Sequence, residues 1–250
     1  MMKCGKNHLD LHHQNMNVNL YRACWIKAQF NTAILMILFR NKYWLLLVLL
    51  LISTILNAEE WIEVTHVYDG DTIQLMDGRH VRLIGINAPE IRHEDRKGNY
   101  QKAEPFGEDA KQYLTNKLIH QKVSLEMDHE TQDHYHRILA YVFLPDGTIL
   151  NNKMVEQGLA YCLTVSPNTR YEKQLVKTQQ IAMDSGKGIW KRIAKNSCQT
   201  YIGNKKSKRF HTPDCTFNKH SPLKNRIVFN QIWDCFYNGY APCKRCVVMP

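Results

Sequence analysis

Stretches of β-branched and apolar residues alternate with turn signals from Trp61 onward. Asp69-Gly70 and Asp77-Gly78 separate the first three stretches at hairpin spacing, and Pro145-Asp146-Gly147 follows the last one. This pattern is typical of short strands joined by tight turns. It predicts five strands, at residues 61–68, 71–76, 79–86, 122–127 and 137–144.

Three other segments have helical patterning. In residues 103–119 apolar side chains recur at the spacing of one helix face. The residues on that face are Ala110, Tyr113, Leu114 and Leu118. A short helix at 152–157 is expected to stop at Gly158, and a longer one at 171–183 is expected to end before Gly186. Five strands with about three helices predict an α+β domain at residues 61–193, built as an OB-fold five-stranded β-barrel.

The N-terminal part contains an uncharged apolar run at residues 43–56, preceded by Arg40 and Lys42. The run is shorter than the ~20 residues that a membrane-spanning helix needs. Its basic flank, with Ala58 as the small residue before cleavage, is typical of a signal peptide. We interpret residues 1–58 as an N-terminal extension and signal peptide, with Met36 as an alternative start. An uncleaved membrane anchor is the other interpretation, and both predict an exported protein, periplasmic or secreted.

The formal net charge of +10 is unevenly spread along the chain. Residues 59–186 hold 14 Lys and Arg against 20 Asp and Glu, whereas residues 187–250 hold 13 against 2. A basic segment suits a polyanion, because neutralising phosphates releases condensed counterions. The alternative is a solvated face without a ligand.

Three blocks of polar residues stand at the ends of the predicted strands. They are Asp69-Gly-Asp-Thr72, Arg82-Leu-Ile-Gly-Ile-Asn87-Ala-Pro-Glu90 and Asp133-His-Tyr135-His-Arg137. In their order and approximate spacing they resemble the staphylococcal nuclease family. The resemblance continues through residues 104–110, 155–160 and 188–190 and covers just over half of the chain. A lone Asp-Gly-Asp-Thr is an ordinary turn, but all the blocks in register are a specific signal.

The resemblance implies phosphodiester hydrolysis, which must stabilise charge on phosphate oxygens while a water attacks in line. Guanidinium groups can fork onto these oxygens, and the resemblance gives this role to Arg82 and Arg137. It makes Glu90 the general base. Taken singly, Arg82 also suits an outward charge on a strand, Glu90 a loop cap, and Arg137 a surface partner of Asp133.

The resemblance also implies a catalytic Ca²⁺ site with Asp71 as the carboxylate ligand and Ala88 ligating through its carbonyl. Asn87 stands where the family has a second ligating carboxylate, so weaker Ca²⁺ binding is expected. Around this site the resemblance places Asp69 and Asp133, with Tyr135 contacting the nucleotide. In the loop 161–167 only Tyr161 remains where the family type member carries base-packing tyrosines, so substrate preference is expected to differ.

Residues 200–250 contain His211-x₃-Cys215 and, later, Cys243-x₂-Cys246, a usual set of Zn²⁺ ligands. A Cys-x-x-Cys alone would also suit a redox pair or a disulfide outside the cytoplasm. The segment resembles the zinc-binding N-terminal module of Ada-type DNA-repair proteins, where the first ligand is a cysteine, so His211 puts their alkyl-accepting chemistry in doubt. We expect a structural zinc ion in a small α/β module.

Several residues of this segment keep alternatives open. His220 is a rival ligand to His211. Cys162, Cys198 and Cys235 lie outside the ligand set, and a Cys198–Cys235 disulfide is one option. A basic run predicts either a phosphate-binding patch or a solvated loop. Its residues are Lys205, Lys206, Lys208 and Arg209.

Together these features predict an exported, Ca²⁺-dependent endonuclease that cleaves DNA, RNA or both and, by resemblance, leaves 3′-phosphates. The zinc-binding tail is expected to bind nucleic acid. We expect a monomer without a nucleotide cofactor, touching a membrane only through an uncleaved N-terminal segment. The alternatives are a non-catalytic nucleic-acid-binding protein, or a zinc module that binds protein or cell wall. Retention of Asp71, Arg82, Glu90 and Arg137 favours the enzyme.

Overall fold

The computed structural model describes residues 60–94, 100–101, 103–195, 198–219 and 221–247. The predicted signal peptide and the rival ligand His220 lie outside these residues. Within the described ranges, every helix is too short or too polar to cross a membrane.

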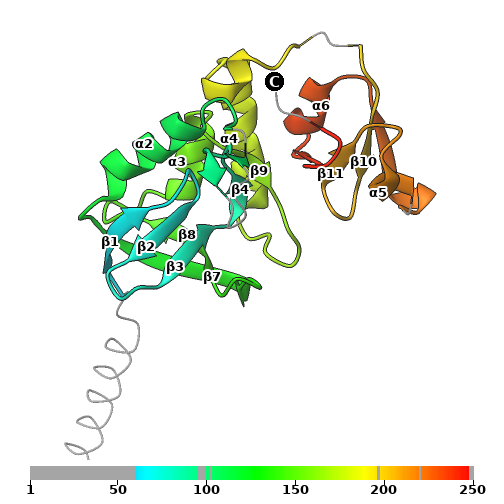
Figure 1. Cartoon of the computed structure of the whole chain (residues 1–250). Coiled ribbons are helices and arrows are strands. Elements are labelled where there is room, and N and C mark those ends of the chain that lie inside the picture. Colours follow the sequence, from blue (N-terminus) through cyan, green and yellow to red (C-terminus); the bar gives the residue numbers. More distant parts are fainter. Residues whose placement is uncertain (1–59, 95–99, 102, 196–197, 220, 248–250) are drawn as a thin grey trace, which may run out of the picture. The chain divides into compact units, whose positions relative to one another are not determined.

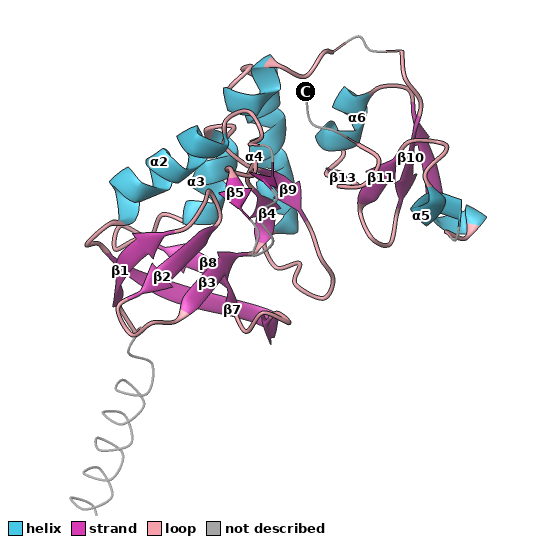
Figure 2. Cartoon of the chain, viewed as in Figure 1, coloured by secondary structure: helices cyan, strands magenta, loops and turns pink. Residues whose placement is uncertain are grey.

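Five strands form a closed barrel in the order β1-β2-β3-β8-β7 (Figure 2). Their bounds are β1 Ile62–Val67, β2 Thr72–Leu75, β3 His80–Leu83, β7 Lys122–Gln132 and β8 Ile138–Phe143. All neighbours are antiparallel except β3 and β8, which run parallel and place Arg82 opposite Leu139. The predicted α+β fold with a five-stranded barrel is thus confirmed.

The first three strands are joined by the two predicted Asp-Gly turns. β1 pairs with β2 and β2 with β3, both antiparallel. Gly78 has a φ of 85°, a left-handed value that a residue without Cβ adopts at little cost. The hairpin between β1 and β2 carries Asp69 and Asp71 to the edge of the barrel, where the candidate site lies.

Three helices, as expected, lie on one side of these strands (Figure 1). They are α2 Gly107–Leu118, α3 Leu150–Glu156 and α4 Glu172–Asp184. Helix α2 begins four residues later than predicted, because Gly107 N donates to Glu104 O in a turn and Phe106 adopts a left-handed φ of 68°. Its face of Ala110, Leu114 and Leu118 is buried in the core.

One predicted strand divides in two. Residues 79–86 were expected as a single strand, but Gly85 has a φ of 77° and turns the chain out of the barrel. The second part, β4 Gly85–Asn87, pairs antiparallel with β9 Tyr161–Leu163, a strand that the pattern did not predict. This turn places Asn87 and Ala88 beside the β1–β2 hairpin. A further short pair, β5 His93–Glu94 and β6 Tyr100–Gln101, follows.

The C-terminal segment forms a four-stranded sheet in the order β12-β10-β11-β13. The strands are β10 Tyr201–Asn204, β11 Arg209–His211, β12 Arg226–Phe229 and β13 Ala241–Pro242. The helical elements are η1 Gly188–Lys191, α5 Thr216–Lys219, η2 Leu223–Asn225 and α6 Ile232–Tyr237. The sheet with α5 and α6 has the small α/β character expected for residues 200–250.

Two hydrophobic cores stabilise the fold. The first fills the barrel and the space beneath α2 and α3, and includes Ile73, Leu114 and Met154. The second core joins residues 161–193 to the C-terminal segment, and in it Trp190 and Tyr161 pack against Phe236. Residues that would be surface on an isolated nuclease domain are therefore buried against the C-terminal sheet and α6.

Candidate active site and metal centre

The buried carboxylate of Asp71 is the centre of the candidate site. It leaves the β1–β2 hairpin, where its own N–H donates to Asp69 Oδ1 at 2.9 Å. Its Oδ2 lies 2.9 Å from Arg82 Nη2 and accepts the Ala88 N–H at 2.8 Å. Because Thr72 and Arg82 are paired across β2 and β3, strand register brings the acid and the guanidinium together.

Burial raises the pKa of Asp71 to about 6, although the neighbouring Arg82 guanidinium lowers it in part. Asp69 adds to the raised pKa through its nearby negative charge. A further positive charge beside this buried carboxylate would stabilise its ionised form. The site therefore favours the binding of a cation next to Asp71.

Asn87 connects three parts of the site. Its Oδ1 accepts from Arg82 Nη2 at 3.2 Å, and its Nδ2 donates to Ala88 O at 2.9 Å and to the Tyr161 hydroxyl at 3.0 Å. The side chain is buried. Two of the predicted Ca²⁺ ligands, Asn87 and Ala88, are therefore hydrogen-bonded to each other, with Asp71 adjacent to Ala88.

Arg137 is positioned by Asp133, its predicted neighbour. The Asp133 carboxylate accepts from Arg137 Nε at 2.8 Å and from the backbone N–H groups of Tyr135 and Arg137. These contacts hold the pKa of Asp133 below its usual value although burial opposes them. The Arg137 guanidinium also lies 5.5 Å from the Tyr135 ring, which is 68% exposed. The ion pair orients Arg137 rather than removing it from solvent.

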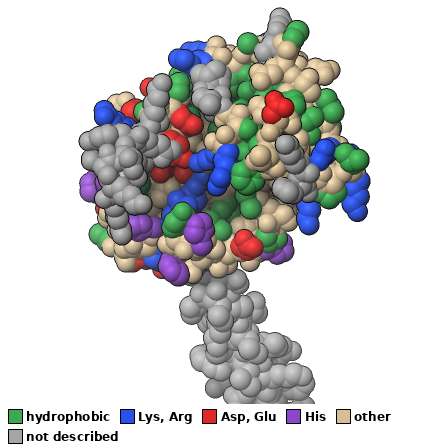
Figure 3. All heavy atoms as spheres, turned by 45° about the vertical axis from the view of Figure 1, so that its right-hand side comes forward, with side chains coloured by type: hydrophobic (Ala, Val, Ile, Leu, Met, Phe, Trp, Pro, Cys, Tyr) green, Lys and Arg blue, Asp and Glu red, His purple; other side chains and the backbone are tan. Residues whose placement is uncertain are grey.

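Arg82 and Arg137 line the same cavity, whose volume is about 480 Å³. Its wall also includes Asp133, Leu163 and Val165. Figure 3 shows basic and acidic side chains gathered side by side around a hollow of this face. A phosphodiester entering the cavity would meet two guanidinium groups, Arg82 from β3 and Arg137 from the loop just before β8.

Glu90 follows β4 and is outside the residues that line this cavity. Its N–H donates to Glu104 Oε2 at 2.9 Å, and Glu104 N donates back to Glu90 O at 2.8 Å. Its own carboxylate contacts Lys244 Nζ, at 2.5 Å. Glu90 stands two residues after Ala88, whose N–H donates to Asp71 Oδ2.

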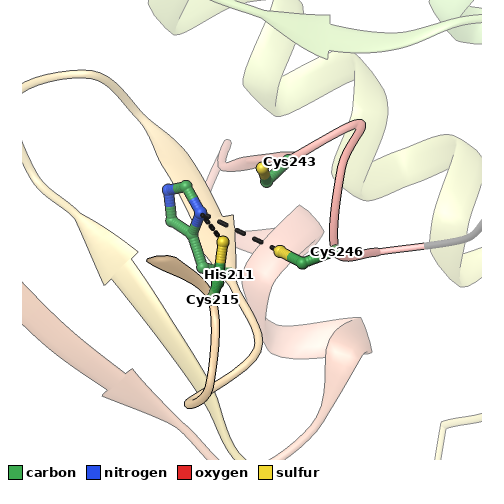
Figure 4. A group of neighbouring side chains, drawn as sticks. All are labelled: His211, Cys215, Cys243 and Cys246. Atoms are coloured by element: carbon green, nitrogen blue, oxygen red, sulfur yellow. Dashed lines mark hydrogen bonds between the residues drawn. The ribbon is translucent and has the colours of Figure 1, made fainter. Parts of the chain in front are cut away.

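The predicted zinc ligands come together from two segments far apart in the sequence, the end of β11 with the loop after it and the loop after β13 (Figure 4). The ligand atoms of His211, Cys215, Cys243 and Cys246 all lie within 4.8 Å of one another. His211 Nδ1 is 3.4 Å from Cys215 Sγ and 3.9 Å from Cys246 Sγ. Burial lowers the pKa of His211, which keeps its imidazole neutral and able to ligate. The four residues could hold a tetrahedral metal ion.

The remaining described cysteines are unpaired. Cys162 and Cys235 are buried and Cys198 is exposed, all as free thiols. Burial raises the pKa of Cys162 and of Cys235. The optional Cys198–Cys235 disulfide is therefore not formed in this structure.

Several contacts near the site were not predicted from the sequence. Lys244 and Glu104 contact Glu90, and Tyr161 holds Asn87 instead of standing ready for a base. Tyr161 is 2% exposed and packs on Phe236, so it is unavailable for base stacking. The block at residues 104–110 gave a local signal for Glu104, whereas nothing in the spacing could pair Lys244 with a residue 154 positions earlier.

The described residues thus form a closed five-stranded barrel with two arginines, Arg82 and Arg137, lining one cavity. Comparison with known proteins agrees. The family described as "Staphylococcal nuclease homologue" matches residues 80–192. The thermonuclease of Staphylococcus hyicus is 34% identical over 135 residues, which cover 53% of this chain and 76% of that protein. The thermonuclease of Staphylococcus intermedius is 36% identical over 143 residues, covering 56% and 81%.

The endonuclease YncB of Bacillus subtilis is 31% identical over 141 residues, 54% of this chain and 64% of that protein. The chain belongs to the staphylococcal nuclease family, and it is a nuclease-type hydrolase. These matches cover about half of the chain. The C-terminal segment with its Cys/His cluster lies outside the family match, which ends at residue 192.

Proposed function

We propose that this protein is an exported, Ca²⁺-dependent endonuclease that hydrolyses DNA, RNA or both, assisted by a zinc-binding C-terminal module. The observation that carries the proposal is the convergence of Arg82 and Arg137 on one cavity beside buried Asp71. Export rests on the signal-like run at residues 43–56 alone.

In the proposed reaction Arg82 and Arg137 bind the non-bridging oxygens of the scissile phosphate. Each arginine can do so while a carboxylate holds its guanidinium in an ion pair, Asp71 for Arg82 and Asp133 for Arg137. Their charge is worth most as negative charge grows on the phosphate in the transition state. Glu90 accepts the proton of the attacking water, since a carboxylate at this position is the base that the family resemblance implies.

The residues that would hold Ca²⁺ are Asp71, Asn87 and the carbonyl of Ala88. The donor set fits, because all three offer oxygen, which this hard cation prefers. Burial raises the pKa of Asp71, and a cation bound beside this carboxylate would lower the pKa again by favouring the charged form. Ca²⁺ would supply additional positive charge for the phosphate. Asn87 weakens the fit, because its amide lacks the charge of a carboxylate and its N–H groups occupy Ala88 O.

We propose a structural role for zinc in the C-terminal module. The cluster of three thiols and one imidazole suits a closed tetrahedral site. The likeness to Ada-type modules remains a resemblance of sequence pattern. The cluster is adjacent to the shared core, where Phe210 and Phe236 are fully buried. A metal ion there would fix the loop 243–246 against β11.

The test is digestion of plasmid DNA and of RNA by the purified protein, with Ca²⁺ and with chelator. We expect cleavage with Ca²⁺, loss of cleavage with chelator, and a loss of roughly 10²–10⁴ in kcat for Glu90→Ala. Lys173→Gln, on the exposed face of α4, is the matched surface control and should cleave normally. Cleavage that persists in chelator and in Glu90→Ala contradicts both the metal and the base assignment.

A further inference from the structure

Lys244 lies in the loop between two candidate zinc ligands, Cys243 and Cys246, yet its ammonium reaches the nuclease part of the chain. Nζ is 2.5 Å from Oε1 of Glu90. Loop 243–246 lies outside the match to the family, which ends at residue 192. A residue outside the family domain therefore touches the proposed general base.

The main chain of Glu90 is fixed from one side. Glu104 accepts the Glu90 N–H through its carboxylate at 2.9 Å and donates its own N–H to Glu90 O at 2.8 Å. The start of α2 also approaches closely, since a Cβ on Gly107 would meet Glu90 O at 2.6 Å. These contacts act on the backbone, so the direction of the carboxylate depends on contacts made to its own oxygens.

Lys244 is presented by an anchored loop. Pro242 O accepts from Arg209 Nη1 at 3.0 Å, and Cys243 N donates to Phe210 O at 2.9 Å. β13 runs parallel to β11 and so joins this loop to the sheet. The proposed zinc ion, bound by residues on both sides of Lys244, would fix it further.

The C-terminal module is docked through a buried interface and not only through this ion pair. The Gln179 side chain is fully buried; its Nε2 donates to Phe236 O at 2.5 Å and its Oε1 accepts from Cys162 N at 2.6 Å. The Tyr161 hydroxyl accepts a hydrogen bond from the Asn87 amide. The Tyr161 ring packs edge-on against Phe236, with the ring centroids 5.6 Å apart. Core packing of this kind holds the two loops in register.

We propose that Lys244 is a positioning residue for Glu90, so that the C-terminal module completes the active site of this nuclease. The proposal rests on the proposed function, in which Glu90 takes a proton from the attacking water. An ammonium on Oε1 restricts the carboxylate to one orientation and leaves Oε2 to accept that proton. Orientation of a base toward its water is worth a large factor in rate.

This pair contributes little to folding stability. The Lys244 side chain is 56% exposed and that of Glu90 is 24% exposed, and ion pairs so open to solvent are strongly screened. Its loss should therefore leave the melting temperature unchanged. The effect of Lys244 belongs in kcat.

The test is steady-state cleavage of a fluorophore-quencher DNA oligonucleotide by the full chain at saturating Ca²⁺. Lys244→Met, which keeps the length of the side chain, should lower kcat about tenfold with little change in KM, melting temperature or zinc content. Lys244→Arg should recover most of kcat. Lys224→Met removes the same charge from an exposed position of the same module and should match the wild type.

Three outcomes overturn the proposal. The first is an unchanged kcat in Lys244→Met. The second is a raised KM with a reduced salt dependence, which would mean that Lys244 contacts a phosphate of the substrate. The third is an increased kcat, which would mean that Lys244 inhibits the enzyme. Glu90→Ala separates this proposal from the function itself. If Glu90→Ala is inactive and Lys244→Met is normal, only the positioning role fails; if Glu90→Ala is active, the base assignment fails. In Glu90→Ala, adding Lys244→Met should cause no further loss.

Discussion

At the scale of single residues, Asn87 departs most clearly from what a cation site favours. Its amide bridges Arg82, Ala88 O and the Tyr161 hydroxyl in a buried environment. A neutral side chain there satisfies the surrounding polar groups without a metal. The same arrangement costs affinity, because one proposed ligand is uncharged and another, Ala88 O, already accepts a hydrogen bond.

We predict that Asn87→Asp raises Ca²⁺ affinity by about tenfold, because it adds a charge and frees Ala88 O. The measurement is isothermal titration calorimetry with Ca²⁺ on the wild type and the variant. Asn152→Asp, the same change on helix α3, is the control and should leave the affinity unchanged. Equal affinities for wild type and Asn87→Asp would show that residue 87 is not a ligand.

A second residue-scale prediction concerns the Asp133–Arg137 pair. Hydrogen bonds from Arg137 depress the pKa of Asp133, so its contribution to stability is complete above the unfolded pKa of about 4 and is lost as pH falls below it. Asp133→Asn should therefore lower the free energy of unfolding by roughly 1 kcal/mol at pH 7, and the difference should shrink steadily as the pH falls below about 4 toward the lowered pKa of the folded state. Denaturant unfolding across this pH range measures it.

The same variant should lower kcat about tenfold, because Arg137 would lose the group that orients it. Asp146→Asn is a suitable comparison, since Asp146 is an exposed turn residue that also accepts a backbone N–H. A stability difference that stays constant from pH 7 to pH 3 would mean that the carboxylate charge is not what matters.

At the scale of elements, the Cys/His cluster is carried by segments with little regular structure. The cluster joins the end of β11 to the loop after β13, and these strands are only three and two residues long. Short parallel strands give few hydrogen bonds. A metal ion would replace the missing pairing with direct bonds between the loops.

Loss of the metal should accordingly destabilise this element. We expect one zinc ion per chain by elemental analysis, and loss of it in Cys243→Ser. At zinc concentrations a thousandfold above Kd, binding would stabilise the fold by about 4 kcal/mol, which Cys243→Ser should forfeit. Cys198→Ser, at an exposed cysteine outside the cluster, should keep both metal and melting temperature. A metal-free wild type with the melting temperature of the zinc-loaded protein would refute the site.

At the scale of the whole molecule, the two parts of the chain differ in net charge but share a hydrophobic core. The nuclease part is acidic and the C-terminal part basic, yet they share one hydrophobic core around Trp190 and Phe236. Deleting residues 197–250 would therefore expose buried apolar surface as well as remove charge. Substitution of surface lysines separates the two effects.

The structure divides the basic run. Lys205 and Lys206 are exposed in the turn between β10 and β11, whereas Lys208 lies 5.1 Å from the Tyr240 ring and Arg209 is tied to Pro242 O. We predict that Lys205→Gln with Lys206→Gln lowers the salt slope of DNA binding by about 1.8, the value for two lost phosphate contacts.

Fluorescence anisotropy with a DNA duplex in Ca²⁺-free buffer, over a range of salt concentrations, measures the slope. Lys173→Gln with Lys177→Gln removes two exposed charges from α4 and is the matched control. If both pairs change the slope equally, net charge and not a defined patch accounts for the binding.

Local pattern sufficed for much of the barrel and its helices. The Asp-Gly turns and the period-2 stretches predicted β1, β2 and β8 to within about two residues, because hairpin geometry depends on neighbouring residues. The strand at 79–86 was predicted without its break, since only the packing of Gly85 against Leu175 and Tyr141 shows why the chain turns there. Strand β9 was missed because its three residues are strands only through pairing with β4.

The sequence by itself determined the family, the candidate residues and the cysteine–histidine set, because each is written in short blocks whose chemistry depends on residue type and spacing. Only the tertiary structure decided what those residues touch. It buried Tyr161 under Phe236, tied Asn87 to Ala88 and brought Lys244 to Glu90. Such contacts join residues far apart in the chain, and they follow from how the two cores pack, which no local pattern encodes.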